Sequence, residues 1–104
     1  MPDVDPIFDA LGDATRRQVL RHLAESGSAT PTELADTLPV TRQAVSKHLG
    51  VLQAAGLVTS ARAGRETRFT FRPEPLTDAA AWMADVGGRW DRRLDALQKR
   101  LASD

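Results

Sequence analysis

Cysteine is absent from this sequence of 104 residues, so disulfide bonds, thiolate metal sites and cysteine nucleophiles are all excluded. No apolar run approaches the roughly 20 residues that a membrane-spanning helix needs. The first five residues also lack the basic start of a signal peptide. We therefore expect one cytoplasmic domain, residues 1–104, with a small core and no membrane partner.

An excess of charge of one sign is also missing, because 14 basic side chains balance 14 acidic ones. The balance is not uniform along the chain. Residues 41–72 contain six basic side chains and one acidic one, whereas the segments on either side carry more acids than bases. A basic centre between acidic flanks is typical of a protein with one face that contacts phosphates. A solvated charged loop would have the same composition.

A helix with two different faces is predicted between Thr41, a suitable N-cap, and Gly56, a suitable left-handed residue after the last turn. Val45, Leu49 and Leu52 are spaced so that they share one apolar face. Hydrogen-bonding side chains lie at the start of the helix, away from that face: Arg42, Gln43, Ser46 and Lys47. Such a helix can anchor one side in a core and place the other in a DNA major groove.

Three shorter helices are predicted before it. The first spans about residues 6–11, and the second, with Asp13 as N-cap, spans about residues 14–24 before Ser26-Gly27-Ser28 breaks it. The third, residues 31–37, begins at Thr30-Pro31-Thr32-Glu33, which combines an N-cap, a proline at the first helical position and a capping box. A tight turn joins it to the two-faced helix, and this pair predicts a helix-turn-helix.

We call the two-faced helix the recognition helix, because its polar face is the one expected in the DNA major groove. A β-hairpin is predicted directly after it. Phe69 and Phe71 alternate with polar residues, which is the period of a half-buried strand. The two strands, residues 57–62 and 66–72, flank a tip with Gly64, and prolines end the hairpin. A hairpin in this place is a wing. The expected fold class is therefore mainly α with a β-hairpin: a winged helix-turn-helix of about five helices and a two-stranded wing, with residues 7–72 as DNA-binding core and 57–72 as wing.

The remaining helix, residues 76–102, carries apolar or small residues in alternating steps of four and three, which is a heptad seam. We expect this helix to dimerise with the same helix of a second copy, although the seam could also pack within one chain. Gly87 and Gly88 mark a close helix approach or a kink. The expected dimer-interface residues are Met83, Gly87, Trp90, Leu94, Leu97 and Leu101.

Several short motifs at fixed offsets resemble one known family, the ArsR-type winged helix-turn-helix repressors. They are Ala10-Leu11-Gly12-Asp13-Ala14-Thr15-Arg16-Arg17, Val45-Ser46-Lys47-His48-Leu49 and Ala55-Gly56-Leu57-Val58, followed by the wing residues Gly64-Arg65. The terminal Trp90-Asp91-Arg92-Arg93-Leu94 resembles the metal-independent branch of that family. The resemblance implies a dimeric bacterial transcriptional repressor that releases DNA in response to an effector, which the sequence does not identify.

The same resemblance shows a departure from the metal-sensing members. Those carry paired cysteines at the start of the first helix of the helix-turn-helix, or Asp and His ligands on the last helix. This chain has no thiol, and its last helix has aspartates but no histidine. Soft or borderline metals prefer thiolate and imidazole ligands, so we expect no zinc, arsenic or cadmium site and no cofactor.

Each DNA-binding residue is assigned a role by its chemistry. Arg42 suits guanine and Gln43 suits adenine in the major groove, and Ser46 suits either bases or backbone. Phosphate contacts are assigned to Lys47, Arg68 and the helix starts near Thr32 and Thr41. Arg62 and Arg65 suit a minor groove. As alternatives, Arg42 could pair with Asp36 and Arg65 with Glu66.

The expected function is a sequence-specific, homodimeric repressor that binds a near-palindromic operator and associates with the nucleoid. An architectural DNA-binding protein without sequence preference and a winged helix that binds only proteins are the alternatives. An enzyme is not expected, because the sequence shows no nucleophile–base pair and no phosphate-binding glycine loop. His22 and His48 are expected to be structural, with His48 packed or bonded to the backbone. Trp82 and Trp90 are expected in a core or dimer interface.

Overall fold

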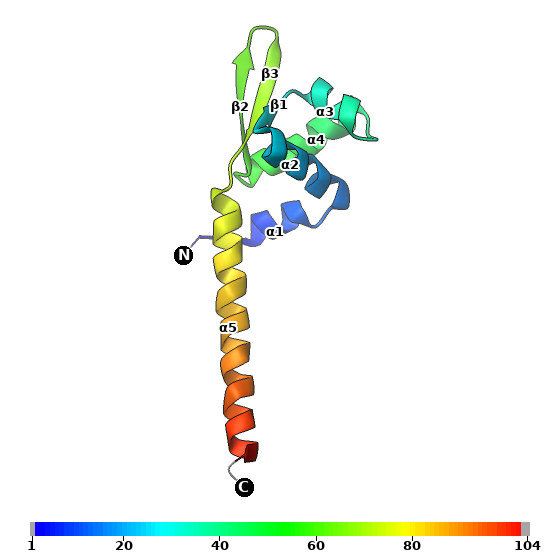
Figure 1. Ribbon diagram of the computed structural model, residues 1–104. Coiled ribbons are helices and arrows are strands. Elements are labelled where there is room, and N and C mark those ends of the chain that lie inside the picture. Colours follow the sequence, from blue (N-terminus) through cyan, green and yellow to red (C-terminus); the bar gives the residue numbers. More distant parts are fainter. Residues whose placement is uncertain (1, 103–104) are drawn as a thin grey trace.

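The computed structural model describes residues 2–102, which form five helices and one three-stranded antiparallel sheet (Figure 1). The order along the chain is α1 (Asp5–Leu11), α2 (Ala14–Ser26), β1 (Ser28–Ala29), α3 (Pro31–Thr37), α4 (Arg42–Ala54), β2 (Val58–Ala63), β3 (Glu66–Phe71) and α5 (Glu74–Ala102). We call residues 4–72 the head. The helix-turn-helix α3–α4 and the hairpin β2–β3 lie where the sequence predicts them.

The helix starts confirm the predicted caps. The Asp13 side chain accepts a hydrogen bond from the backbone N–H of Arg16 at 2.9 Å, and the Thr41 side chain accepts one from Ala44 at 3.1 Å. Gly56 has a φ of +77°, the left-handed conformation expected after α4. Because each cap satisfies a backbone donor that the helix itself cannot, these residues fix where the helices begin.

Three helix boundaries differ from the prediction. α1 begins one residue earlier, and α2 continues to Ser26, where Gly27 at φ +83° ends it. α5 begins at Glu74, so Pro75 lies in its first turn instead of ahead of the helix. Proline is tolerated there because the N–H that it lacks would have no partner in that turn.

The predicted two-stranded wing is present as β2–β3, but the sheet also contains a third strand, β1, which was not predicted and pairs with β3. Ser28 lies opposite Thr70 and Ala29 opposite Phe69. Gly27 turns the chain sharply after α2, and its carbonyl accepts a hydrogen bond from Phe71 N–H at 3.1 Å. A strand of two residues is too short to show an alternation of apolar and polar side chains. β1 can therefore be recognised only in the folded chain.

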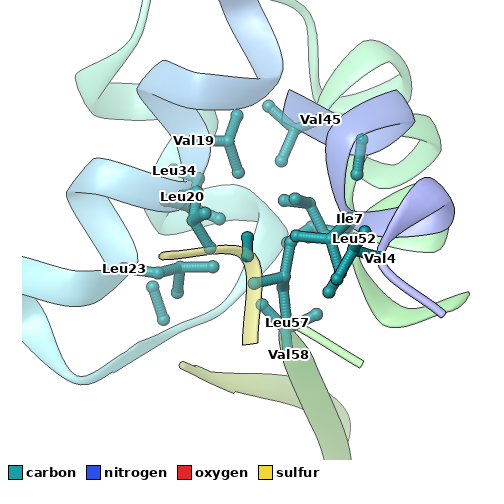
Figure 2. Packing of buried hydrophobic residues seen from close by; sticks show 14 residues of the cluster. Val4, Ile7, Val19, Leu20, Leu23, Leu34, Val45, Leu52, Leu57 and Val58 are labelled. Atoms are coloured by element: carbon teal, nitrogen blue, oxygen red, sulfur yellow. The ribbon is translucent and has the colours of Figure 1, made fainter. Parts of the chain in front are cut away.

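The buried core lies between the helices and the base of the sheet, and all its members belong to the head except Ala79 of α5. Figure 2 shows its side chains converging from separate elements. The labelled members are Val4, Ile7, Val19, Leu20, Leu23, Leu34, Val45, Leu52, Leu57 and Val58. Among residues 2–102, no buried side-chain nitrogen or oxygen lacks a hydrogen-bond partner, so this core carries no penalty for an unpaired polar group.

α5 leaves the head and extends away from it as an isolated helix (Figure 1). Only Ala79 of its 29 residues is buried, and the ring of Trp82 packs edge-on against that of Phe8 at 5.3 Å. The radius of gyration is 18.9 Å, compared with about 13 Å for a compact domain of this length. None of the described helices combines the length and apolar character needed to cross a bilayer.

Candidate nucleic-acid interface

The apolar face of α4 fixes the direction of its polar face. Val45, Leu49 and Leu52 are completely buried, which confirms the predicted anchor. Four residues at the helix start are exposed: Arg42, Gln43, Ser46 and Lys47. The start of a helix fixed in this way can present its side chains to a groove without moving relative to the core.

A polar hollow of about 380 Å³ lies between the helix-turn-helix and the wing. We call it the basic hollow. Five of the nine predicted DNA-binding residues line it: Thr32, Arg42, Ser46, Arg62 and Arg65. They come from α3, α4, β2 and the wing tip, so the fold brings together side chains that are far apart in the sequence. Three guanidinium groups beside one carboxylate, that of Glu66, make the hollow attractive to anions.

The remaining predicted residues do not line the hollow. Gln43 and Lys47 are exposed on α4 outside it. The Thr41 hydroxyl is used as the N-cap of α4. All three belong to α4 or to its N-cap, and Figure 1 shows α4 within the head, next to α3.

Arg68 lies in a network inside the head. Its guanidinium forms an ion pair with Glu33 at 3.1 Å and donates to the Ser28 hydroxyl at 3.3 Å. The carboxylate of Glu33 also accepts a hydrogen bond from Thr30 N–H at 2.9 Å. That backbone bond, and then the nearby charge of Arg68, hold the pKa of Glu33 below its usual value. Arg68 therefore joins the wing to the start of α3, and phosphate would have to compete with Glu33 for it.

The other cations of this surface lack such internal partners. Within the described chain, residues 2–102, the alternative pairs Arg42–Asp36 and Arg65–Glu66 do not form. Lys47 and Arg62 also form no ion pair in that part of the chain. Their charges are available to an outside anion without first breaking an ion pair in the head.

Sequence reasoning missed Arg16, which links three helices. It lies in α2, and its Nε donates to the Ala10 carbonyl at the end of α1 at 2.7 Å. Its Nη1 lies 3.3 Å from Nδ1 of His48 on α4. The half-buried His48 thus contacts a side chain, whereas a packed or backbone-bonded ring was predicted. The two residues are 32 positions apart, so only the folded chain shows the contact.

A second missed contact joins the recognition helix to the wing: the Gln53 amide donates to the Ser60 hydroxyl at 3.1 Å.

Between residues 2 and 102, no three His, Asp or Glu side chains lie close enough together to hold a metal ion. The candidate surface described above consists of cationic and hydrogen-bonding side chains from α3, α4, β2 and the wing tip.

The predicted dimer-interface residues form an exposed apolar stripe on α5. Five of them are at least 41% exposed in the single chain: Met83, Trp90, Leu94, Leu97 and Leu101. Val86, at 46% exposed, widens the stripe beyond the predicted seam. The helix continues without interruption through Gly87 and Gly88. A stripe of large apolar side chains on an isolated helix is unusual for a monomer.

Comparison with known proteins also finds a helix-turn-helix domain and transcriptional regulators. The profile of a family described as "Helix-turn-helix domain" matches residues 11–61. The uncharacterized HTH-type transcriptional regulator YuzN of Bacillus subtilis is 49% identical over 78 residues, 69% of this chain and 85% of the relative. The HTH-type transcriptional regulator Rv2034 of Mycobacterium tuberculosis is 40% identical over 100 residues, 96% of this chain and 90% of the relative. The transcriptional repressor SdpR of B. subtilis is 27% identical over 88 residues, 85% of this chain and 97% of the relative.

Solved structures are similar over most of the chain. The ArsR-like transcriptional regulator from Rhodococcus sp. RHA1 superposes with a TM-score of 0.82 and 41% identity, covering 92% of this chain and 90% of that one. The homodimeric winged helix-turn-helix DNA-binding domain of Mb0332 from Mycobacterium bovis superposes with a TM-score of 0.65 and 25% identity, covering 82% and 78%.

Proposed function

Because this chain belongs to the family of ArsR-like winged helix-turn-helix transcriptional regulators, we propose that it acts as a homodimeric repressor that binds a near-palindromic operator. Its family makes the chain a DNA-binding transcriptional regulator. The residues that contact DNA, the homodimer and the repression of transcription are proposed here. The observation that carries it is the basic hollow, in which three arginines from the recognition helix and the wing converge beside an exposed helix start. The repressor SdpR and the homodimer of Mb0332 support the finer assignment.

In this proposal, α4 lies in the major groove and reads bases with Arg42 and Gln43. A guanidinium can donate two hydrogen bonds to guanine, and an amide can donate and accept at adenine. Ser46, one turn along α4, contacts either a base or the backbone. The wing places Arg62 and Arg65 in or beside the minor groove, where a narrow A·T tract attracts arginine.

Phosphate contacts supply most of the affinity that does not depend on sequence. Lys47 and the helix starts at Thr32 and Thr41 are proposed to make them. Arg68 is assigned the same role, with its bond to Glu33 exchanged for a phosphate oxygen. These contacts position the protein on DNA, in the cytoplasm and on the nucleoid, but they do not select a sequence.

The second copy is proposed to bind along the apolar stripe of α5. Two copies related by a two-fold axis would present two recognition helices to the same side of the duplex. Half-sites would then be separated by about one helical turn, roughly 10 base pairs, or by a multiple of it. Such an operator has near-palindromic symmetry because the protein has two-fold symmetry.

Selection of bound sequences from random duplex DNA tests this function. We expect an enriched inverted repeat that binds about a thousandfold or more above its scrambled counterpart, with affinity that falls steeply as salt is raised. Salt-dependent binding without any enriched motif would instead support an architectural protein. An absence of DNA binding at low salt would refute the assignment and favour a protein-binding winged helix.

A further inference from the structure

A second hollow, of about 580 Å³, lies where α2, the end of β3 and the start of α5 meet. None of its lining residues belongs to the basic hollow. Its walls are mainly apolar, and they are formed by Leu11, Leu20, Phe71 and Leu76. Phe71 and Leu76 are only partly buried. The volume falls within the range of small-molecule sites, roughly 300–1,000 Å³.

The charge on its rim is entirely positive. Arg17 and Arg21 lie one turn apart on the outer face of α2, so they are neighbours on the helix surface. Arg17 is held in place by a hydrogen bond to the Leu11 carbonyl. Arg21 forms no ion pair within the described part of the chain, although Glu25 lies one turn further along α2. Two like charges at this spacing repel each other, and an anion between them would relieve the repulsion.

We propose that this junction hollow binds a small organic anion: a carboxylate on an aliphatic or aromatic body. The body would lie against Leu20, Phe71 and Leu76, which removes apolar surface from water. The carboxylate would accept paired hydrogen bonds from the guanidinium of Arg21, with Arg17 and the Gln18 amide beside it. The absence of a carboxylate side chain from the lining makes the site selective against cations.

The position of the hollow gives its ligand a regulatory role, and this step rests on the proposed function. Leu20 belongs to the head, Phe71 ends the wing strand β3, and Leu76 lies in the first turn of α5. A ligand that contacts all three would favour one angle between the head and α5. In a dimer joined through α5, that angle sets the distance between the two recognition helices. A ligand that prefers one angle must therefore change operator affinity, and DNA must change ligand affinity by the same factor.

Sodium decanoate is a suitable probe, because it joins one carboxylate to a flexible apolar chain. We would titrate it into the full-length protein by calorimetry, below the concentration at which it forms micelles, with decyltrimethylammonium as the cationic counterpart. We expect decanoate to bind and the cation not to bind. Arg21→Gln should weaken decanoate binding about tenfold or more, since it removes a charge-assisted contact. Arg92→Gln, an exposed arginine of α5, is the matched control and should have no effect.

A second variant tests the apolar part of the site without touching its charge. Ala24 lines the hollow and is exposed, so Ala24→Trp should fill the space while the head stays folded. We expect this variant to lose decanoate binding and to retain its melting temperature. Decanoate binding that is equal in wild type, Arg21→Gln and Ala24→Trp would overturn the site. A wild-type dimer that does not bind decanoate would also overturn the site. That result is expected if the second copy of the chain covers the hollow.

Operator affinity measured without decanoate tests the proposed DNA-binding function separately from the ligand site. A protein that binds the selected operator but not decanoate refutes only the ligand site. A protein that binds decanoate through Arg21 but shows no preference for any DNA sequence refutes the proposed function and leaves the site in place. We expect saturating decanoate to change operator affinity at least fivefold in the wild type, and to leave Ala24→Trp unchanged.

Discussion

Replacement of Trp90 by alanine should separate the proposed dimer into monomers at concentrations where the wild type is dimeric. Trp90 is 59% exposed in the single chain. A tryptophan side chain of about 250 Å² therefore offers about 150 Å² to a partner, worth at most about 4 kcal/mol at about 25 cal/mol per Å². If the partner covers half of that surface, each copy loses about 2 kcal/mol. The symmetric dimer carries the substitution twice, so its dissociation constant should rise about a thousandfold.

Sedimentation equilibrium over a wide range of protein concentrations measures both dissociation constants. Asp91→Ala is the matched control, because Asp91 is the next residue but lies on the charged side of α5. It should dissociate like the wild type. The reasoning is refuted if Trp90→Ala and wild type dissociate at the same concentration, or if the wild type is monomeric at micromolar concentration while it still binds its operator.

Three further predictions concern the head. Gln43→Ala should weaken binding to the selected operator about tenfold or more and leave binding to scrambled DNA unchanged, and equal losses in a filter-binding or anisotropy titration would contradict base reading by Gln43. Lys47→Ala should reduce the slope of log affinity against log salt by about 0.9 for each phosphate that Lys47 neutralises, and an unchanged slope would show that Lys47 touches no phosphate. Because the pKa of Glu33 is lowered by its bond from Thr30 N–H, its stabilising effect is present above its usual pKa of 4.5 and is lost as pH falls through the lowered value. Glu33→Gln keeps an acceptor for that bond but cannot titrate. Its melting temperature should therefore be lower than that of the wild type at pH 7, and the difference should shrink as the pH falls through the lowered pKa. Parallel pH profiles of the two proteins would argue against this role.

The elements that could be predicted are those whose signals are local. At Thr30-Pro31-Thr32-Glu33 the cap, the proline and the returning carboxylate all lie within four residues, and the structure contains that capping box. Val45, Leu49 and Leu52 follow one another at helical spacing on the same face of α4, and all three side chains are buried. In both cases a single helix carries the whole pattern, so the sequence alone is sufficient.

The features that could not be predicted depend on contacts between distant residues. Arg68 meets Glu33 across 35 positions, and the sequence offered no reason to pair them. Arg16 meets His48 across 32 positions. Neither contact repeats with a helical or strand period. The basic hollow has the same origin, since Arg62 and Arg65 of the hairpin and Arg42 of α4 line one hollow only in the folded chain. Which of these cations touch DNA stays a prediction.

The isolation of α5 has a consequence for how the protein responds to its own abundance. Among the described residues of α5, only Ala79 is buried in the core of the head and Leu76 packs partly buried against it, so most of the helix takes no part in folding the head. Below the dissociation constant of the proposed dimer, the amount of dimer rises with the square of the total protein, and doubling expression yields about four times as much of the form that grips both half-sites. A regulator built this way would switch its target genes over a narrower interval of expression than a monomer would, and the strength of the α5 contact would set where that interval lies.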